Sequence, residues 1–225
     1  MGGFRIQYTG CDKLVRPIAR SNRLPDRTSP DCTRMHWPES ITTDRLVLRP
    51  PVETDAHAIF DGYAQDPDVV RYLTWRPHKS VSQTLEFLSF CRSGWATASD
   101  FTWALTLKGD DRLIGMIGLR PRGFKPDLGY VLAKAYWGRG LMAEAGRAIV
   151  SLAFSDPNVY RVWAVCDVDN RASSRVLEKL GMTREGVLRR WTVHPNISDE
   201  PRDSYCYARV RPNGAVPPQQ PERRS

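Results

Sequence analysis

The sequence predicts an α+β fold, with a mixed but mostly antiparallel sheet of about six or seven strands flanked by about four helices. Three observations lead to this prediction. Residues 101–119 alternate in hydrophobicity on both sides of a polar turn, as a hairpin does. Residues 127–154 have the pattern of a strand, a glycine-containing turn and an amphipathic helix. Residues 162–180 repeat the strand and helix order. Hairpins beside such units are typical of α+β proteins.

The N-terminal part of the fold is expected to begin with a strand over residues 45–49. A helix follows, because four apolar side chains fall at i, i+3, i+4 and i+7 on one face. They are Ala56, Ile59, Phe60 and Tyr63. Residues 80–95 are predicted to form a second helix.

The central hairpin is predicted from period-two alternation in residues 101–107, a pattern typical of a half-buried strand. Its partner is expected at residues 113–119, across a turn at residues 108–112. A third strand is predicted at residues 127–133.

The next helix is predicted from one apolar stripe. Its residues are Leu141, Ala145, Ala148, Ile149 and Leu152. Residues 162–166 are apolar at every position, as in a strand covered on both faces. A helix over residues 171–180 is expected to end at Gly181, and strands near residues 185–191 and 204–211 complete the sheet.

Length and composition favour one domain. The chain has 225 residues and 41% hydrophobic residues, enough for one sizeable core, which we assign to residues 38–212. Residues 1–37 and 213–225 are rich in polar residues and proline without apolar periodicity, so we expect poorly ordered tails.

The net charge of +8 does not mark a nucleic-acid-binding face. Residues 1–36 hold seven Lys or Arg against three Asp or Glu, and residues 211–225 hold three against one. The remainder holds 23 against 21, so the predicted domain is nearly neutral and nucleic acid is disfavoured as its partner.

Five cysteines are widely spaced and include no C-x-x-C pair, so neither a disulfide framework nor a zinc site is expected. No run approaches 18 apolar residues, and the N-terminus lacks the pattern of a signal peptide. We expect a cytoplasmic protein without a membrane span or a metal.

The turn before the helix at 141 is the strongest candidate site. Gly138 and Gly140 flank Arg139 where a helix N-terminus presents free N–H groups to an anion. The spacing matches neither the P-loop nor, in this hairpin context, the dinucleotide fingerprint. By themselves, the glycines are also explained by a tight turn.

Three separated segments resemble the GNAT acetyltransferase superfamily, in the branch of the ribosomal-protein alanine N-acetyltransferases. The first is TDRLVLR at residues 43–49, and the second is DLGYVL with WGRGLMAEA, between residues 127 and 145. The third is DNRASSRVLEKLGM at residues 169–182. The likeness spans roughly residues 40–211, in the expected order.

The resemblance implies the GNAT fold and acetyl-CoA as co-substrate. Its cofactor-loop pattern, Q/R-x-x-G-x-G/A, is matched strictly only at Gly140. The implied pyrophosphate loop is Trp137, Gly138, Arg139, Gly140, Leu141 and Met142. The pantetheine arm is implied to run past Leu132 and Ala133, with the Leu132 N–H polarising the thioester carbonyl and Asn170 touching a pantetheine amide.

Two catalytic residues follow from the same resemblance. Asp127 takes the place of an acidic residue that can accept the proton of the amine, directly or through water. Ser173 takes the place of a serine that can protonate the leaving thiolate, a role that Leu177 cannot fill. Each also has a structural interpretation: Asp127 as a surface aspartate, Ser173 as a packing residue and Asn170 as a helix cap.

The predicted activity is therefore transfer of an acetyl group from acetyl-CoA to a primary amine, either a protein N-terminus or a small molecule. Residues 189–196 are expected to close over this acceptor, unless they form an ordinary exposed loop. The alternative is a non-catalytic acyl-CoA-binding module, favoured by Leu177 and Met142. The sequence leaves a homodimer open.

Overall fold

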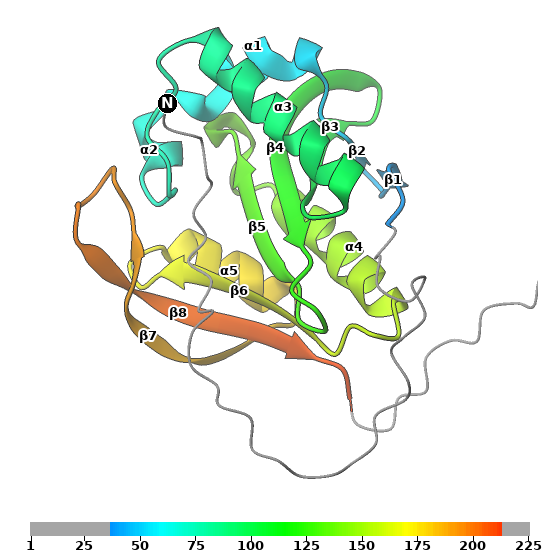
Figure 1. The fold of residues 1–225 in the computed structure, drawn as a ribbon, viewed down its shortest axis with the longest axis vertical. Coiled ribbons are helices and arrows are strands. Elements are labelled where there is room, and N and C mark those ends of the chain that lie inside the picture. Colours follow the sequence, from blue (N-terminus) through cyan, green and yellow to red (C-terminus); the bar gives the residue numbers. More distant parts are fainter. Residues whose placement is uncertain (1–36, 213–225) are drawn as a thin grey trace, which may run out of the picture.

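The computed structural model describes residues 37–212, which form one eight-stranded sheet in the order β1-β2-β3-β4-β5-β6-β8-β7 (Figure 1). All neighbours are antiparallel except β5 and β6. The strands are β1 (Ile41–Thr42), β2 (Leu46–Arg49), β3 (Phe101–Leu107), β4 (Asp110–Arg120), β5 (Asp127–Leu132), β6 (Arg161–Asp167), β7 (Thr183–Val193) and β8 (Pro201–Val210). The α+β prediction is confirmed, with one strand more than expected, because the two-residue β1 has no periodicity to reveal it.

Five α-helices lie within the described residues: α1 (Ala56–Ile59), α2 (Pro67–Val70), α3 (Val81–Thr97), α4 (Leu141–Ser155) and α5 (Arg171–Lys179). The four predicted helices are present, although the first continues past α1 as a wider turn over Phe60–Ala64. The one-turn α2 was not predicted. Its N-cap is Asp66, whose carboxylate accepts the Asp68 N–H at 2.9 Å.

The central hairpin turns more tightly than the sequence predicts. β4 already begins at Asp110, so the turn consists of Lys108 and Gly109, not of residues 108–112. Gly109 has a φ of 81°, which a two-residue hairpin turn commonly requires. The predicted tails, residues 1–36 and 213–225, lie outside the described residues.

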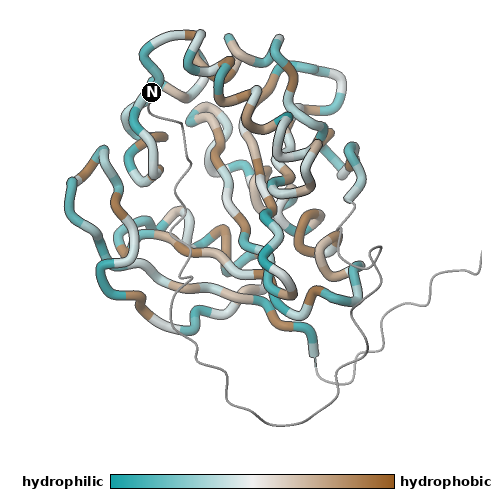
Figure 2. Tube along the Cα trace, in the orientation of Figure 1, coloured by the Kyte–Doolittle hydropathy of each residue, from teal (hydrophilic) through white to brown (hydrophobic). Residues whose placement is uncertain are grey.

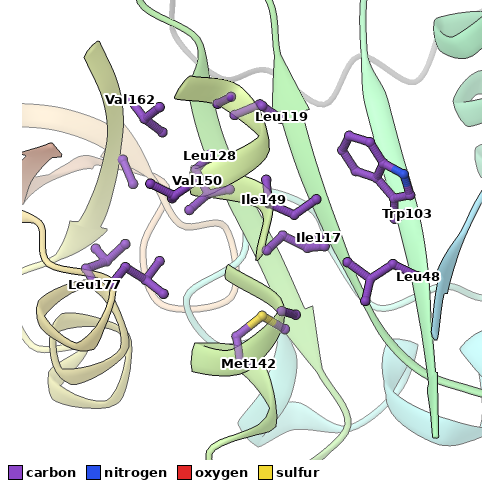
Figure 3. Packing of buried hydrophobic residues seen from close by; sticks show 14 of the residues in the cluster. Leu48, Trp103, Ile117, Leu119, Leu128, Met142, Ile149, Val150, Val162 and Leu177 are labelled. Carbon is purple, nitrogen blue, oxygen red and sulfur yellow. The ribbon is translucent and has the colours of Figure 1, made fainter. Parts of the chain in front are cut away.

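The helices cover the sheet on two faces. On one face α1 and α3 pack against β3 and β4, burying Ile59, Leu88 and Met116. On the other face α4 and α5 pack against the centre of the sheet and form the larger core (Figure 3). In that core Ile149 and Val150 from α4 meet Ile117 and Leu128. Hydrophobic residues follow the central strands and α4, whereas the outer loops are largely hydrophilic (Figure 2).

Strands β5 and β6 separate, and this separation positions the site. They pair at one register position, Asp127 with Trp163, at the beginning of β5. Beyond it β5 runs upright in Figure 1 while β6 and β8 run across the view. The far end of β5 therefore carries an edge facing β6 that no strand covers.

Candidate active site

The turn between β5 and α4 exposes backbone amides at a helix N-terminus. Gly138 and Gly140 have φ angles of 72° and 75°, a left-handed conformation that favours glycine. Gly140 is the N-cap of α4, and no side chain caps the helix. A Cβ on Gly138 would meet nothing within 4 Å, so the loop faces open space. Such an N-terminus can bind a phosphate.

The turn between β1 and β2, which contains Thr43 and Arg45, holds this loop in place. The Glu144 carboxylate accepts the Thr43 hydroxyl at 2.6 Å and the Arg45 N–H at 2.9 Å, and the Arg45 guanidinium also donates to the Arg139 carbonyl at 3.0 Å. Burial alone would raise the pKa of Glu144, but the hydrogen bonds from Thr43 and Arg45 outweigh it and hold that pKa below its ordinary value. The first two resembling segments are thus in direct contact.

Strand β5 presents N–H groups toward the opening. The Ala133 N–H donates to the Ile114 carbonyl of the β4 side at 2.9 Å. Since successive residues of a strand alternate the side to which their N–H groups point, those of Leu132 and Tyr130 point away from β4, toward β6. The Leu132 carbonyl points the same way and accepts the indole N–H of Trp137 at 2.7 Å.

A central cavity of about 750 Å³ joins these groups. Its walls are the β5 edge, the α4 N-terminus, one face of α5, and two loops from opposite ends of the sequence. Its lining residues include nine of the eleven predicted site residues: Asp127, Leu132, Trp137, Gly138, Gly140, Leu141, Met142, Asn170 and Ser173. Ala133 and Arg139 do not line the cavity, but each is adjacent in sequence to a residue that does.

The predicted residues contribute different chemical groups to this cavity. The Leu141 and Met142 side chains are buried in the core, so only their backbone belongs to the loop (Figure 3). Asn170 caps α5, since its side chain accepts the Ser173 N–H at 3.0 Å. The Arg139 guanidinium lies over the Tyr136 ring, 5.6 Å from its centroid.

Ser173 is hydrogen-bonded to a tyrosine that the sequence did not single out for chemistry. Its hydroxyl lies 2.7 Å from the Tyr130 hydroxyl, which also contacts the Ser173 carbonyl at 3.2 Å. Burial raises the pKa of Tyr130, so its hydroxyl stays protonated and available as a donor. The pair links β5 to α5 across the cavity.

Asp127 is buried, and not on the surface. Its carboxylate forms an ion pair with Arg120, and the Arg122 Nε lies 3.5 Å from its Oδ1. It sits where β5 and β6 still pair, at the closed end of their separation. Any proton transfer to Asp127 has to compete with these two guanidinium groups.

The sequence of the chain matches a known protein family. A model described as "Acetyltransferase (GNAT) domain" matches residues 45–183, more than half of the chain. The chain belongs to the GNAT acetyltransferase family. It is accordingly an acetyl-CoA-dependent N-acetyltransferase.

Three relatives illustrate the relation. The chain is 31% identical to "Uncharacterized N-acetyltransferase YoaA" of Bacillus subtilis, over 76% of this chain and 97% of that protein. It is 26% identical to the "[Ribosomal protein uS5]-alanine N-acetyltransferase" of Escherichia coli, over 77% and 91%. A GNAT-family acetyltransferase structure from Bacillus anthracis superposes with a TM-score of 0.67 at 27% identity, over 76% and 98%.

This acetyltransferase has a second polar cluster on the side of the cavity away from the α4 N-terminus. It consists of His194, Asp167, Arg202 and Asp169, from the ends of three strands. His194 and Asp167 line the cavity. Residues 189–196, predicted as an acceptor loop, belong to β7 as far as Val193, so the loop begins only at His194. Asp167 was not predicted, because nothing in its local sequence distinguishes it from other strand-end aspartates.

The described residues of this acetyltransferase contain no helix long and apolar enough to cross a membrane. Nor do residues 37–212 bring together three His, Cys, Asp or Glu side chains that could hold a metal ion. Cys91, Cys166 and Cys206 are free thiols, and burial raises the pKa of each.

Proposed function

We propose that this acetyltransferase moves the acetyl group directly from acetyl-CoA to a primary amine while both are bound. The observation that carries the proposal is the β5 edge, whose Leu132 N–H faces one cavity together with the α4 N-terminus and Ser173. Acetyl-CoA, when bound, supplies a thioester whose carbonyl carbon the amine nitrogen can attack. A single cavity that reaches both loops supports a ternary complex.

The donor side binds through backbone and cationic groups. The amides at Trp137–Met142 hold the pyrophosphate at the positive end of the α4 dipole. Arg175 and Lys179 line the same cavity from α5 and offer charges to the nucleotide phosphates. The uncovered edge of β5 binds the pantetheine amides, and the Leu132 N–H stabilises negative charge that develops on the thioester oxygen.

The leaving thiolate takes its proton from Ser173. Its hydroxyl is hydrogen-bonded to Tyr130, which orients it and, as a neutral phenol, stabilises the alkoxide character that develops during transfer. Leu177 is fully buried in the core and offers no donor, which supports the assignment of this role to Ser173.

The acceptor ammonium must lose a proton before its nitrogen can attack. The acidic and imidazole side chains that line the cavity are Asp68, Asp127, Asp167 and His194, and the candidates among them are Asp127, predicted from the sequence, and His194. Asp127 lies deep between the strands beside Arg120, whereas His194 lies at the end of the cavity where the acceptor enters, which we call the acceptor end.

The acceptor enters between residues 71–74 and the end of β7. Tyr72, Trp191 and Thr192 line this end of the cavity. Asn196 fixes the entrance, since its side-chain amide donates to the carbonyls of Val70 and Trp75 at 2.7 Å each. The E. coli relative, by its name, acts on a ribosomal protein, which makes a protein N-terminal amine one candidate acceptor and a small amine the other. The free thiols support a cytoplasmic setting.

Titration calorimetry with acetyl-CoA, followed by CoA release against a panel of amines and N-terminal peptides, tests the proposal. We expect binding and turnover with at least one primary amine. Saturable binding without CoA release across the panel would indicate the non-catalytic acyl-CoA-binding alternative, and absence of binding at millimolar acetyl-CoA would contradict both.

A further inference from the structure

The second polar cluster contains a buried histidine, His194, whose ring lies near the backbone carbonyls of Leu73 and Tyr72. The His194 side chain is 5% exposed and lines the central cavity. Neither of its ring nitrogens makes a hydrogen bond of normal geometry. Leaving a buried polar group without a partner is costly, so such a group usually has a ligand or a functional role.

Asp167 fixes the other side of this ring. Its carboxylate lies 3.6 Å from the His194 Nε2 and is fully buried at the end of β6. The Arg202 Nε donates to its Oδ2 at 2.7 Å, and the Asp169 N–H donates to its Oδ1 at 2.9 Å. Burial alone would raise the pKa of Asp167, but these hydrogen bonds outweigh it and hold the pKa below its ordinary value.

Charged and aromatic groups from three parts of the chain surround the His194 ring. Arg202 is shared between Asp167 and Asp169, so two carboxylates face one guanidinium. From the segment after α2, Tyr72 meets the His194 ring edge-on at 6.2 Å between centroids. Arg71 lines the same end of the cavity, with its guanidinium 5.5 Å from the Tyr72 ring centroid, so two guanidinium groups balance the two carboxylates and Asp167 is the acidic group nearest the ring.

His194 is neutral in this environment. Burial lowers its pKa from the ordinary 6.5, while Asp167 and the carbonyls of Leu73 and Tyr72 oppose the shift and Arg202 reinforces it. A neutral imidazole can accept a proton at neutral pH, and the Asp167 carboxylate then stabilises the imidazolium.

We infer that His194 is the base that deprotonates the acceptor amine, with Asp167 as the residue that orients its ring. The inference rests on the proposed transfer reaction. The ammonium gives one proton to a His194 nitrogen, and the freed lone pair forms the new C–N bond as the C–S bond breaks. The second proton of the attacking nitrogen passes to the thiolate through Ser173, and His194 returns its proton to solvent.

The geometry assigns this role to His194 and not to Asp127. Asp127 is held by Arg120 with Arg122 close by, at the end of the cavity where β5 and β6 are still paired. His194 lies at the end where the acceptor enters, between Tyr72 and Thr192.

The test is the pH dependence of kcat/KM for the full chain with an amine found in the panel, in wild type, His194→Gln and Asp127→Asn. In wild type we expect an acidic limb set by His194. In His194→Gln, kcat/KM at pH 7 should fall by about 10²-fold. Its acidic limb should move up to the pKa of the acceptor itself, about 7.7–8.0 for an α-amine, because only neutral amine can then react. Asp127→Asn should keep the wild-type limb.

His78→Gln is the matched control. His78 is also a buried histidine whose pKa burial lowers, but it is hydrogen-bonded to Thr84 at 2.8 Å and does not line the cavity. It should leave the limb in place. If His194→Gln loses its fold, His194→Ala with added imidazole replaces it, and recovery of rate with imidazole supports the inference.

The outcomes separate the two proposals. A wild type that binds acetyl-CoA but acetylates no amine overturns the proposed function and the inference with it. A wild type that turns over, with an unchanged limb and rate in His194→Gln, overturns the inference alone. Loss of the limb in Asp127→Asn, with His194→Gln unaffected, assigns the base to Asp127.

Discussion

Single residues in this acetyltransferase act through contacts that sequence spacing does not show. Ser173 and Tyr130 are 43 residues apart, yet their hydroxyls are 2.7 Å apart. The resemblance identified Ser173 and left open whether it is catalytic or only a packing residue. Its hydrogen bond to Tyr130, within the cavity, supports the catalytic assignment.

Ser173→Ala is expected to lower kcat by about 10²-fold, the usual scale for loss of a general acid, because the thiolate would leave without a proton. Acetyl-CoA affinity should stay near the wild-type value, since the site is bound mainly through backbone groups. Steady-state kinetics and calorimetry measure the two effects. Ser174→Ala is the control, because that hydroxyl contacts Cys166 at 3.5 Å instead of Tyr130. Equal losses in both variants would argue for a packing role.

The element that decides donor binding is the β4–β5 pair. Gly115 of β4 lies opposite Leu132, and a Cβ on it would approach the Val131 carbonyl oxygen at 2.5 Å. Only glycine therefore lets β5 lie so close at the position where its N–H faces the cavity. On the other side, Arg45 and Glu144 bind the α4 turn to β2. Both elements are thus held in place by residues outside the cofactor loop.

Gly115→Ala is expected to push β5 outward, with a loss of about 1–3 kcal/mol in the free energy of unfolding, as overpacked sites show. The KM for acetyl-CoA should rise several-fold, because the Leu132 amide moves with the strand. Urea unfolding measures the change in the free energy of unfolding, and steady-state kinetics measures the KM for acetyl-CoA. Gly62→Ala, whose Cβ would meet nothing within 4 Å, should change neither appreciably. A Gly115→Ala protein with wild-type stability and KM would contradict the close-approach argument.

At the scale of the whole molecule, buried titratable groups make stability depend on pH. Burial lowers the pKa of His78 and His194 in the folded chain. Below about pH 6.5 the unfolded chain binds protons at these rings and the folded chain does not, so unfolding takes up protons. Stability is therefore full above pH 6.5 and decreases as the pH falls toward the folded-state pKa values. Asp167 and Glu144, whose pKa values are lowered, add a further loss at lower pH.

We expect the thermal midpoint to fall between pH 7 and pH 5.5 by on the order of 2–4 °C, the shift for about 1 kcal/mol in a domain of this size. Scanning calorimetry over this range measures it. His78→Gln should reduce the drop, because one of the two rings no longer titrates. A midpoint that is constant or higher at pH 5.5 would show that the buried rings do not control stability in this window.

The sequence by itself determined the elements and the donor. The strands at residues 101–107 and 127–132, the helix at 141 and the cap at Gly181 follow from periodicity and turn chemistry, which are local properties of the chain. The ordered segments around Gly140 likewise identified acetyl-CoA. The short β1 and α2 were missed because two to four residues carry too little pattern.

Only the tertiary structure decided which side chains meet. It placed Asp127 against Arg120, Ser173 against Tyr130, and His194, which follows β7, within 3.6 Å of Asp167 at the end of β6. None of these contacts leaves a local periodic trace, because each depends on which residues of separate strands, helices and loops the fold brings together. The identity of the base and the character of the acceptor end are therefore properties of the packed fold.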